Sequence, residues 1–208
     1  MYEPRAVRQL MQHFADAKIG GVCGNLRLRT VNESVGGAGE TTYWSFENQI
    51  KRWEGSVATT LGATGGIYAI RRENFHPQPE DTQVADDLLL PLRITADGRR
   101  VVYERDAVAY EESSTSMQEE FRRKVRVALT SFNCIPHIAR VWPKFTAGVK
   151  LMLFFHKFLR WLGPFFLLAA AFSIPLLEAS PFRVVMLIGL AVFIALTWAG
   201  WIAESVGK

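Results

Sequence analysis

The sequence predicts an α/β domain followed by two membrane-spanning helices. Over residues 1–135, segments with the apolar spacing of an amphipathic helix alternate with short strand-like runs, which favours a sheet covered by helices. Further on, residues 161–177 and 184–203 contain no charged residue, and a spanning helix needs about 20 apolar residues. We therefore expect a cytosolic domain at 1–135, a basic region at 136–160 and a transmembrane hairpin at 161–208.

Charge separates the same parts of the chain. Residues 1–135 carry 17 basic and 18 acidic residues, whereas residues 136–208 carry 7 basic and 2 acidic ones. The net charge of +4 therefore comes from a basic stretch beside an apolar tail. This pattern suits the anionic cytoplasmic face of a membrane, and it argues against nucleic acid as a partner.

The two cysteines, Cys23 and Cys134, lie far apart and belong to no CxxC or Cys/His metal-binding pattern. We interpret them as free thiols in a reducing compartment. The first residues, Met1–Arg5, are polar and lead into an amphipathic segment, so no secretory signal is expected.

The domain begins with a helix and a strand. Apolar residues recur at helical spacing over 4–15, and Pro4 sits where a first turn tolerates proline. Ile19–Arg29 is predicted to be a strand, kinked at its glycines.

A loop over 35–39 and a second helix follow. Thr41 or Thr42 is expected to cap this helix, which runs to about Glu54. The residues expected to contact the core are Trp44, Ile50 and Trp53.

The rest of the domain contains shorter elements. A glycine-rich turn at 62–66 leads into a strand at Ile67–Ile70, and a helix that begins at Asp86 is expected to bend near Pro91. Two strands are predicted at 101–103 and 107–110. A basic helix follows over about 117–133, with Ser116 and Glu119 as its capping box.

The tail is interpreted as membrane-seated. Residues 136–160 combine basic residues with apolar ones and no acid, which predicts one interfacial amphipathic helix. Residues 178–183 form the connector between the two spans, and Trp198 and Trp201 fit an interfacial aromatic belt. The alternative is a buried helical hairpin in a soluble protein. Basic residues before Trp161 predict that residues 1–160 are cytoplasmic, and two spans return the C-terminus to that side.

Asp86 and Asp87 are the first candidates for chemistry. Adjacent carboxylates at a helix start are explained by capping and by the helix dipole. The functional alternative is a general base, which removes the proton from a hydroxyl as that hydroxyl attacks an electrophile.

Two further segments have both a structural and a functional interpretation. Residues 62–66 are either a plain tight turn or a backbone that approaches a ligand closely, and no Gly-Lys-Ser/Thr follows to make a phosphate loop. The basic run at 122–126 is either a solvated helix face or a clamp on a diphosphate, for which arginine offers bidentate contacts.

The order of these motifs resembles that of bacterial membrane-bound family 2 glycosyltransferases, the group of cellulose, hyaluronan and poly-N-acetylglucosamine synthases. The resemblance extends over essentially the whole chain, and its most specific part is the glycine-rich turn leading to Tyr68-Ala-Ile-Arg-Arg72, followed by Asp86-Asp87. It implies a GT-A-like catalytic domain and inverting transfer of a hexose from a nucleotide sugar to a glycan or lipid acceptor. It also implies an inner-membrane location.

The resemblance implies a role for each matching residue. Asp87 matches the general base and Asp86 the acidic residue that supports it. Arg126 matches an arginine that binds the diphosphate. Arg123, which is also expected at the diphosphate, stands where processive members carry glutamine. Val127 replaces the tryptophan that stacks on the acceptor, which argues against a long processive product. The loop near the acceptor corresponds to Gly62, Ala63, Thr64, Gly65 and Gly66.

In such enzymes, the part of the domain that precedes the residue matching Met1 binds the nucleotide and a Mg²⁺ or Mn²⁺ ion. No residue here matches those metal ligands, so we expect a truncated chain that is inactive alone. The rival hypothesis is a non-catalytic membrane protein, either a degenerate half-domain or a subunit completed by another chain. A membrane-anchored basic binding module is a third, less favoured interpretation.

Overall fold

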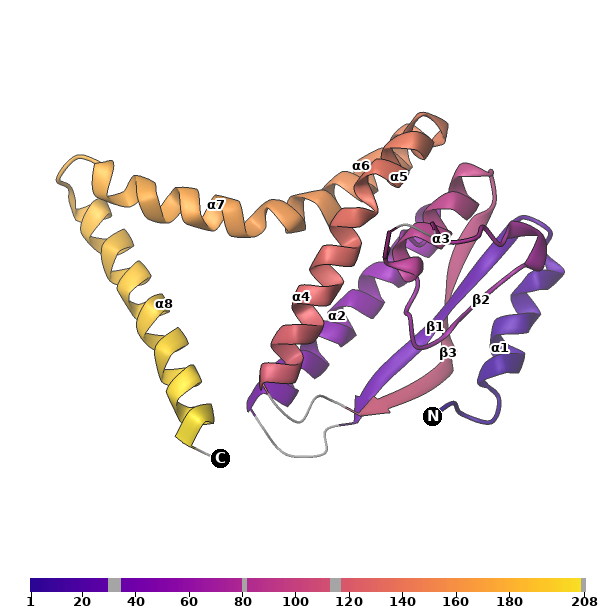
Figure 1. The fold of residues 1–208 in the computed structure, drawn as a ribbon, viewed down its shortest axis with the longest axis horizontal. Helices are drawn as coiled ribbons and strands as arrows, with labels where there is room; N and C mark the ends of the chain where they lie inside the picture. The colour runs from indigo at the N-terminus through magenta and orange to yellow at the C-terminus, as the bar shows by residue number, and fades with distance from the viewer. Residues whose placement is uncertain (30–34, 80–81, 113–116, 207–208) are drawn as a thin grey trace. The chain divides into compact units, whose positions relative to one another are not determined.

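The computed structural model describes residues 1–29, 35–79, 82–112 and 117–206 (Figure 1). The chain forms two compact units, Met1–Leu153 and Phe154–Lys208. The first unit is mixed α/β, mostly helical with a small sheet, and the second is helical. Ser116 of the predicted capping box lies outside the described residues.

Three strands form the sheet of the first unit, in the order β2-β1-β3. The central strand β1 (Ile19–Arg29) pairs antiparallel with β2 (Tyr68–Ile70) and parallel with β3 (Arg100–Glu112). A parallel pair needs a long crossover, which here contains α2, β2 and α3. The two strands predicted at 101–103 and 107–110 are therefore one continuous strand, β3.

The register of β1 against β3 shifts on either side of Gly20 and of Gly24. A Cβ atom at Gly20 would lie 2.6 Å from the Ile94 side chain, and one at Gly24 would lie 2.7 Å from the Ala107 carbonyl oxygen. Both distances are too short for any side chain. The irregularities predicted at the glycines of this strand are thus confirmed, and their cause is close packing.

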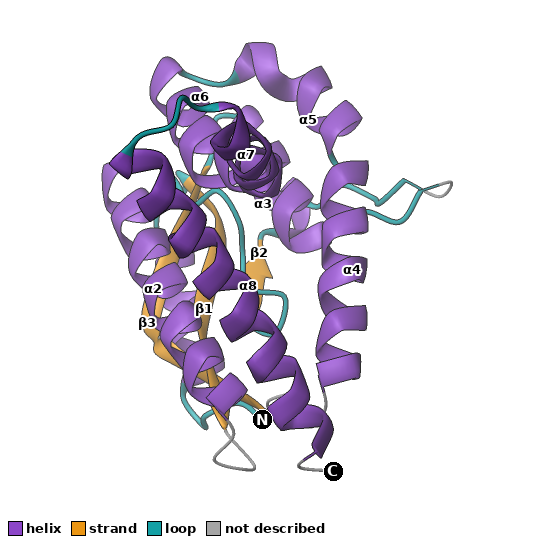
Figure 2. Ribbon diagram, turned by 90° about the vertical axis from the view of Figure 1, so that its left-hand side faces the viewer, coloured by secondary structure: helices purple, strands orange, loops and turns teal. Residues whose placement is uncertain are grey.

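Helices cover both sides of the sheet. Helix α1 lies on one side, and α2 runs along β1 and β3 on the other (Figures 1 and 2). The helices of this unit are α1 (Ala6–Gln12) with the 3-10 turn His13–Ala15, α2 (Val35–Val57), the 3-10 turn Arg72–Asn74, α3 (Asp86–Ala96), α4 (Met117–Asn133), α5 (Ile135–Val141), the 3-10 turn Trp142–Lys144 and α6 (Ala147–Leu153).

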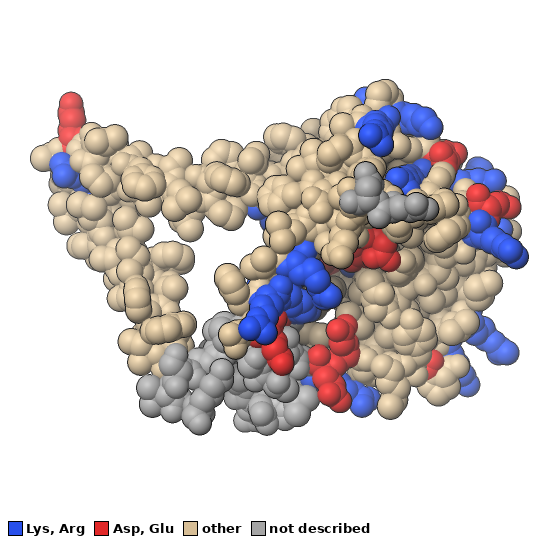
Figure 3. Space-filling model, in the orientation of Figure 1, with Lys and Arg blue, Asp and Glu red and all other residues tan. Residues whose placement is uncertain are grey.

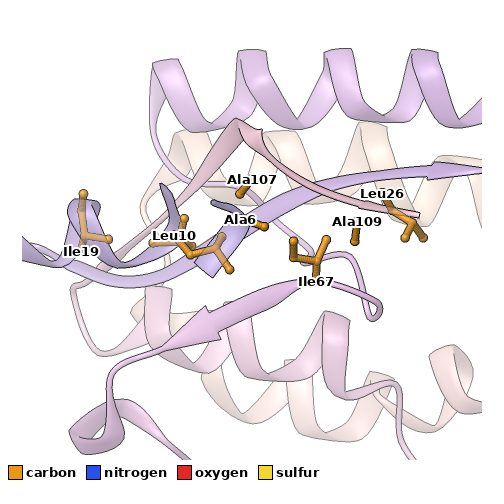
Figure 4. Packing of buried hydrophobic residues seen from close by; sticks show 8 residues of the cluster. Ala6, Leu10, Ile19, Leu26, Ile67, Ala107 and Ala109 are labelled. Atoms are coloured by element: carbon orange, nitrogen blue, oxygen red, sulfur yellow. The ribbon is translucent and has the colours of Figure 1, made fainter. Parts of the chain in front are cut away.

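A core cluster joins α1 to the sheet (Figure 4). Ala6 and Leu10 of α1 pack against Leu26 of β1 and Ala109 of β3, with Ile67 beside them. Small residues on β3 let α1 lie close to the strand. The apolar spacing over residues 4–15 therefore predicted this helix correctly but its buried face only in part, because Leu10 is buried whereas Val7 and Met11 are 56% and 54% exposed.

Helix α2 differs from its prediction in two ways. It begins at Val35, so the loop expected over 35–39 is wrong and Thr41 and Thr42 lie inside the helix. Trp53 is 58% exposed and is not a core residue, while Trp44 and Ile50 are half-buried. The buried side of α2 carries three charged residues: Glu47, Lys51 and Glu54.

The basic region is not one helix. The predicted interfacial helix over 136–160 is divided into α5, a 3-10 turn, α6 and a π-helical turn at Phe154–Phe158. Pro143 falls at the first break, where a helix interior cannot accept proline. Four apolar residues of this region are buried: Ile138, Phe145, Val149 and Leu153. Those side chains therefore do not face a lipid surface.

The second unit contains α7 (Leu159–Ser173), the 3-10 turn Ile174–Leu176 and α8 (Pro181–Val206). Two stretches are long and apolar enough to cross a membrane, Ala147–Leu176 and Pro181–Ile202, and the most apolar 18 residues of each are not buried inside the protein. The prediction of two apolar C-terminal helices is thus confirmed. Helix α8 begins at Pro181, so the connector is shorter than the predicted 178–183.

Candidate functional site

The acidic pair and the glycine-rich turn lie side by side in the first unit. Asp86 and Asp87 form the first turn of α3, and the residue before them, Ala85, has no side-chain cap. Neither aspartate is therefore the N-cap residue, although both lie where the helix dipole favours negative charge.

Pro91 explains how the turn is attached to this helix. The helix continues through Pro91 to Ala96 and does not end there. Because proline has no N–H, Pro91 cannot donate a hydrogen bond to the carbonyl of Asp87, four residues earlier. The backbone N–H of Ala63 donates to this oxygen at 2.6 Å. The proline thus leaves a carbonyl that fixes the glycine-rich turn at the start of α3.

Tyr68 holds the other aspartate. Its hydroxyl donates to Oδ2 of Asp86 at 2.8 Å. Burial raises the pKa of Tyr68 well above its ordinary value, and the hydrogen bond to Asp86 and the charges of both aspartates raise it further. Tyr68 therefore remains a protonated donor, and it orients the Asp86 carboxylate at the exposed rim of the site.

Gly65 faces the second carboxylate. A Cβ atom at this position would lie 3.5 Å from Oδ2 of Asp87, in ordinary contact. The glycines of the turn do not have a positive φ angle, unlike Gly98 elsewhere in the domain. Gly65 and Gly66 are exposed, whereas Ala63 and Thr64 are buried. The exposed half of the turn therefore lies against the Asp87 carboxylate, while the buried half anchors the turn.

A buried polar network, which the sequence analysis missed, supplies the anchor. Lys51 is 3% exposed, and its ammonium group donates to Oγ1 of Thr64 at 2.8 Å and to the Ala63 carbonyl at 3.4 Å. The Thr64 N–H donates to Sγ of Cys23 at 3.1 Å. The ammonium group of Lys51 on α2 and the sulfur atom of Cys23 on β1 thus hold the turn in place.

The same side of α2 holds the chain as it enters the turn. The Glu54 carboxylate accepts from the Leu61 N–H at 3.1 Å, and the Thr60 hydroxyl donates to the Lys51 carbonyl at 3.3 Å. A buried charge is stable only with such compensating hydrogen bonds. The polar stripe of α2 therefore serves the turn, whereas Tyr43, Phe46 and Trp53 of the same helix are exposed.

Helix α4 reaches the site from another side. The Ala85 N–H donates to the Thr130 carbonyl at 3.2 Å, and the Cys134 thiol lies 3.2 Å from the same oxygen. A shallow groove of about 410 Å³ runs along α4, and Arg126 and Gln83 are among the residues that line it. The end of α4 is therefore fixed to the segment that leads into the acidic pair.

The two candidate arginines have different surroundings. Arg126 is exposed and lines the groove. Arg123 is outside the groove, and its guanidinium makes two hydrogen bonds to the Glu120 carboxylate, at 2.9 and 3.0 Å. Within this structure Arg126 is thus presented to a ligand of the groove, whereas Arg123 stabilises its own helix.

No cluster of three or more His, Cys, Asp or Glu side chains that could hold a metal ion occurs in the described part of the chain. Mg²⁺ in proteins keeps several waters and takes only one or two carboxylates together with the phosphate oxygens of a substrate. No chemical step is assigned to a metal ion here.

The residues that the sequence analysis singled out are thus partly assembled. The turn at 62–66 meets Asp86 and Asp87, and Arg126 lies on the neighbouring helix. Lys51, Tyr68 and Cys23 were missed. One signal for Lys51 was present, because charged residues at 47, 51 and 54 share one helix face.

The chain matches no protein-family model. No curated protein resembles it closely enough to count as a match.

Proposed function

We propose that this protein belongs to a membrane-bound glycosyltransferase system and carries the acceptor side of the catalytic site. One observation carries the proposal: the glycine-rich turn is fixed directly against the acidic pair, through the 2.6 Å hydrogen bond from Ala63 to the Asp87 carbonyl. A carboxylate beside an open, glycine-lined surface is what deprotonation of a bound hydroxyl requires. The order of motifs in the sequence is the reason for choosing a sugar as the acceptor.

In this mechanism Asp87 is the general base. It takes the proton of the acceptor hydroxyl while the hydroxyl oxygen bonds to the anomeric carbon of the sugar. The bond from that carbon to the diphosphate breaks at the same time, and the configuration inverts. The order of motifs assigns the base to Asp87, and one oxygen of Asp86 accepts from Tyr68. Its role is to support the site.

The partners follow from this assignment. The donor is a nucleotide-activated hexose, and the acceptor is a glycan or a lipid. Arg126 would contact the leaving diphosphate, since an exposed guanidinium offers bidentate hydrogen bonds to phosphate oxygens. Arg123 would contact the diphosphate only if its guanidinium released the Glu120 carboxylate. The protein groups that hold a divalent cation would lie outside the described residues.

We further propose a location in a cell inner membrane. Two apolar helices of sufficient length support insertion in a bilayer. Residues 1–160 and the C-terminus would then be cytoplasmic, where nucleotide sugars are made. The alternative is a membrane protein without catalysis, and the experiment below separates the two.

The test is transfer of labelled hexose from a panel of nucleotide sugars by membranes that contain the protein, expressed together with any in-frame sequence that precedes it in its gene. Asp87→Asn should lower turnover about 10²- to 10⁴-fold, because the general base is lost. Asp86→Asn should lower it far less. Donor binding should persist in both variants.

Each other result has a clear meaning. Loss of turnover in Asp86→Asn alone would assign the base to Asp86 and contradict our choice. Equal activity of both variants and the wild type would leave the pair with only a structural role. No transfer from any donor, by a protein that is folded and in the membrane, would favour the non-catalytic alternative.

A further inference from the structure

The two glycines nearest the acidic pair form the tip of a tight turn. Gly65 and Gly66 are its central residues, and the Ile67 N–H closes it by donating to the Thr64 carbonyl at 2.9 Å. Thr64 is 1% exposed and Ile67 is fully buried, whereas both glycines are exposed. The ends of the turn are therefore fixed in the core, and the tip, residues 65–66, projects beyond them.

The tip needs a restraint from outside the turn. Glycine has no side chain that could pack, and its backbone has more freedom than that of any other residue. A Cβ atom at Gly65 would lie 3.5 Å from Oδ2 of Asp87, so a movement of the tip changes the space beside this carboxylate. The place where an acceptor hydroxyl would meet Asp87 therefore depends on how the tip is held.

Tyr2 supplies such a restraint. Its hydroxyl donates to the Gly66 carbonyl at 2.9 Å, across 64 positions of the sequence. Tyr2 is 51% exposed, so packing in the core does not account for its position. The hydrogen bond to the tip connects the beginning of the described chain directly to the candidate site.

The segment that carries Tyr2 is itself well fixed. Residues 1–3 run along β3, on the edge opposite β1, where the Glu3 N–H donates to the Val108 carbonyl at 3.0 Å and the Tyr110 N–H donates to the Met1 carbonyl at 2.7 Å. The Tyr110 hydroxyl also donates to the Glu3 carboxylate at 2.8 Å. Tyr2 thus starts from a backbone that is held on both sides of it.

A small residue gives Tyr2 its path to the tip. Tyr2 pairs with Ala109, and Ala109 pairs with Leu26 of β1. Directly paired residues carry their side chains on the same face of a sheet, and Figure 4 shows Ala109 and Leu26 together in the core. Leu26 reaches the tip, since a Cβ atom at Gly66 would lie 3.1 Å from its side chain. The Tyr2 side chain therefore extends past Ala109 toward the turn.

From these contacts we propose that Tyr2 is a positioning residue of the acceptor side. By holding Gly66, it keeps the tip of the turn at the place beside Asp87 that a bound acceptor needs. Tyr2 acts through the turn and does not touch the reacting atoms. This role rests on the proposed function, because it requires an acceptor to bind beside Asp87.

The first test removes the hydroxyl and keeps the ring. Hydrogen–deuterium exchange is measured by mass spectrometry on the full chain in detergent, over peptides that cover residues 62–67. The Ile67 amide closes the turn, so its exchange reports opening of the tip. A neutral hydrogen bond changes such an equilibrium about 2- to 10-fold. Exchange over 62–67 should therefore be about 2- to 10-fold faster in Tyr2→Phe, and an unchanged rate would overturn the proposal.

Tyr110→Phe is the matched control. It also removes one tyrosine hydroxyl that fixes residues 1–3, but this hydroxyl donates to Glu3 and not to the turn. Exchange over 62–67 should change much less in this variant. Equal acceleration in both variants would show that a loosened N-terminal segment, and not the contact with Gly66, controls the tip, which would contradict the proposal.

The second test uses the transfer assay with soluble acceptors. Figure 3 shows acidic and basic side chains interspersed over the visible face of the first unit, so no broad field of one sign there favours a charged acceptor. Uncharged methyl hexosides are therefore the acceptor probes. Tyr2→Phe should raise the KM for the acceptor about 2- to 10-fold, while kcat and the KM for the donor stay unchanged.

The kinetic outcomes separate positioning from stability. A residue with only a structural role would lower kcat, through loss of active protein, and leave the acceptor KM unchanged, so this result would overturn the proposal. If the wild type transferred no sugar to any acceptor, the proposed function would be refuted, and faster exchange in Tyr2→Phe would then describe a structural contact alone. Failure of the positioning role and failure of the proposed function are thus distinguishable.

Discussion

Lys51 combines deep burial with two oxygen partners on one short turn. Its ammonium group is out of contact with water, and it donates to the side chain of Thr64 and to the backbone of Ala63. The ring of Trp44 lies 5.7 Å away and adds a cation–π contact. A buried lysine is stable only where such partners replace its hydration. We therefore expect the position of the turn to depend on this residue.

Replacing Lys51 by methionine should loosen the turn. Cys23 lies beneath Thr64, so its thiol reports the opening. Hydrogen bonds to a charged group contribute about 1.5–3 kcal/mol, and each 1.4 kcal/mol is tenfold. Labelling of Cys23 by a maleimide should therefore accelerate about 10- to 100-fold in Lys51→Met, as measured by mass spectrometry.

The protein contains its own reference for this experiment. Cys134 is the other buried thiol and lies away from Lys51, so its labelling rate reports general unfolding. Arg52→Met, at the exposed neighbour on the same helix, should change neither rate. Equal acceleration at both cysteines would show that Lys51 supports the whole domain. No change at Cys23 would show that Lys51 does not hold the turn.

Cys134 should make stability depend on alkaline pH. Burial, with the charges of Asp87 and Asp86, raises its pKa from the ordinary 9.0 to about 11. The folded protein therefore keeps a proton that the unfolded chain loses, so stability falls as pH rises from about 9 to about 11. Cys134→Ala should show a smaller fall in thermal unfolding temperature over this window. Identical slopes would contradict the shift.

The sequence indicated which residues would meet at the site, but not what holds them. Asp87 and the glycine-rich turn were paired through their order along the chain, and the structure brings them together. Lys51 was missed because Trp44, Ile50 and Trp53 were taken to define the buried face of the helix. A buried face made of Glu47, Lys51 and Glu54 contradicts hydrophobic periodicity. Only the hydrogen-bond partners on the turn make that face possible.

At the level of elements, the glycines of β1 decide how closely its neighbours approach. Gly24→Ala would place a methyl group 2.7 Å from the Ala107 carbonyl oxygen and 2.8 Å from Ile67. The first of these is backbone and cannot move aside. We expect a loss of about 2–3 kcal/mol and a fall in unfolding temperature of roughly 5–10 °C, measured by thermal unfolding in detergent.

Gly148→Ala is the matched control. Gly148 lies in α6, and nothing lies within 4 Å of a Cβ atom there. Alanine is the better helix former by up to about 1 kcal/mol, so this variant should be as stable as the wild type or more so. If Gly24→Ala were equally harmless, the strand would have to tolerate a side chain that the observed register excludes.

The elements that were predicted well are those whose period is simple. Helix 4–15 and strand Ile19–Arg29 were predicted as elements, although Val7 and Met11 are exposed and the first six residues of the strand are all buried, and α4 was predicted with its observed bounds. The single strand β3 was divided in two because a bulge interrupts its alternation between Tyr103 and Val108. The region 136–160 was taken as one helix because its composition hid the effect of Pro143 and the burial of Phe145 and Val149.

At the level of the whole molecule, the two apolar segments are unequal. Residues 161–176 are free of charge and would span about 24 Å as a helix, which is short of the ~30 Å hydrocarbon core. Residues 184–202 would span about 28 Å. The first segment can cross only if the residues before it enter the membrane with their charges extended to the surface. The exposed Arg160 has a side chain long enough for this, whereas Lys157 is buried.

This requirement fixes the expected orientation. Five basic residues, Arg140, Lys144, Lys150, Lys157 and Arg160, precede the first crossing, whereas the connector region has Arg183 beside Glu178. Basic flanks remain on the cytoplasmic side, so the first unit and the C-terminus should both be cytoplasmic. In a bacterial host, green fluorescent protein fused after Lys208 should therefore fluoresce, and alkaline phosphatase inserted after Ser180 should be active. The opposite pair of results would mean either that the orientation is reversed or that the shorter first segment fails to cross. Alkaline phosphatase fused before Met1 separates the two, because it should be active only in the reversed orientation. An active phosphatase after Ser180 with no fluorescence after Lys208 would mean that the second segment fails to cross.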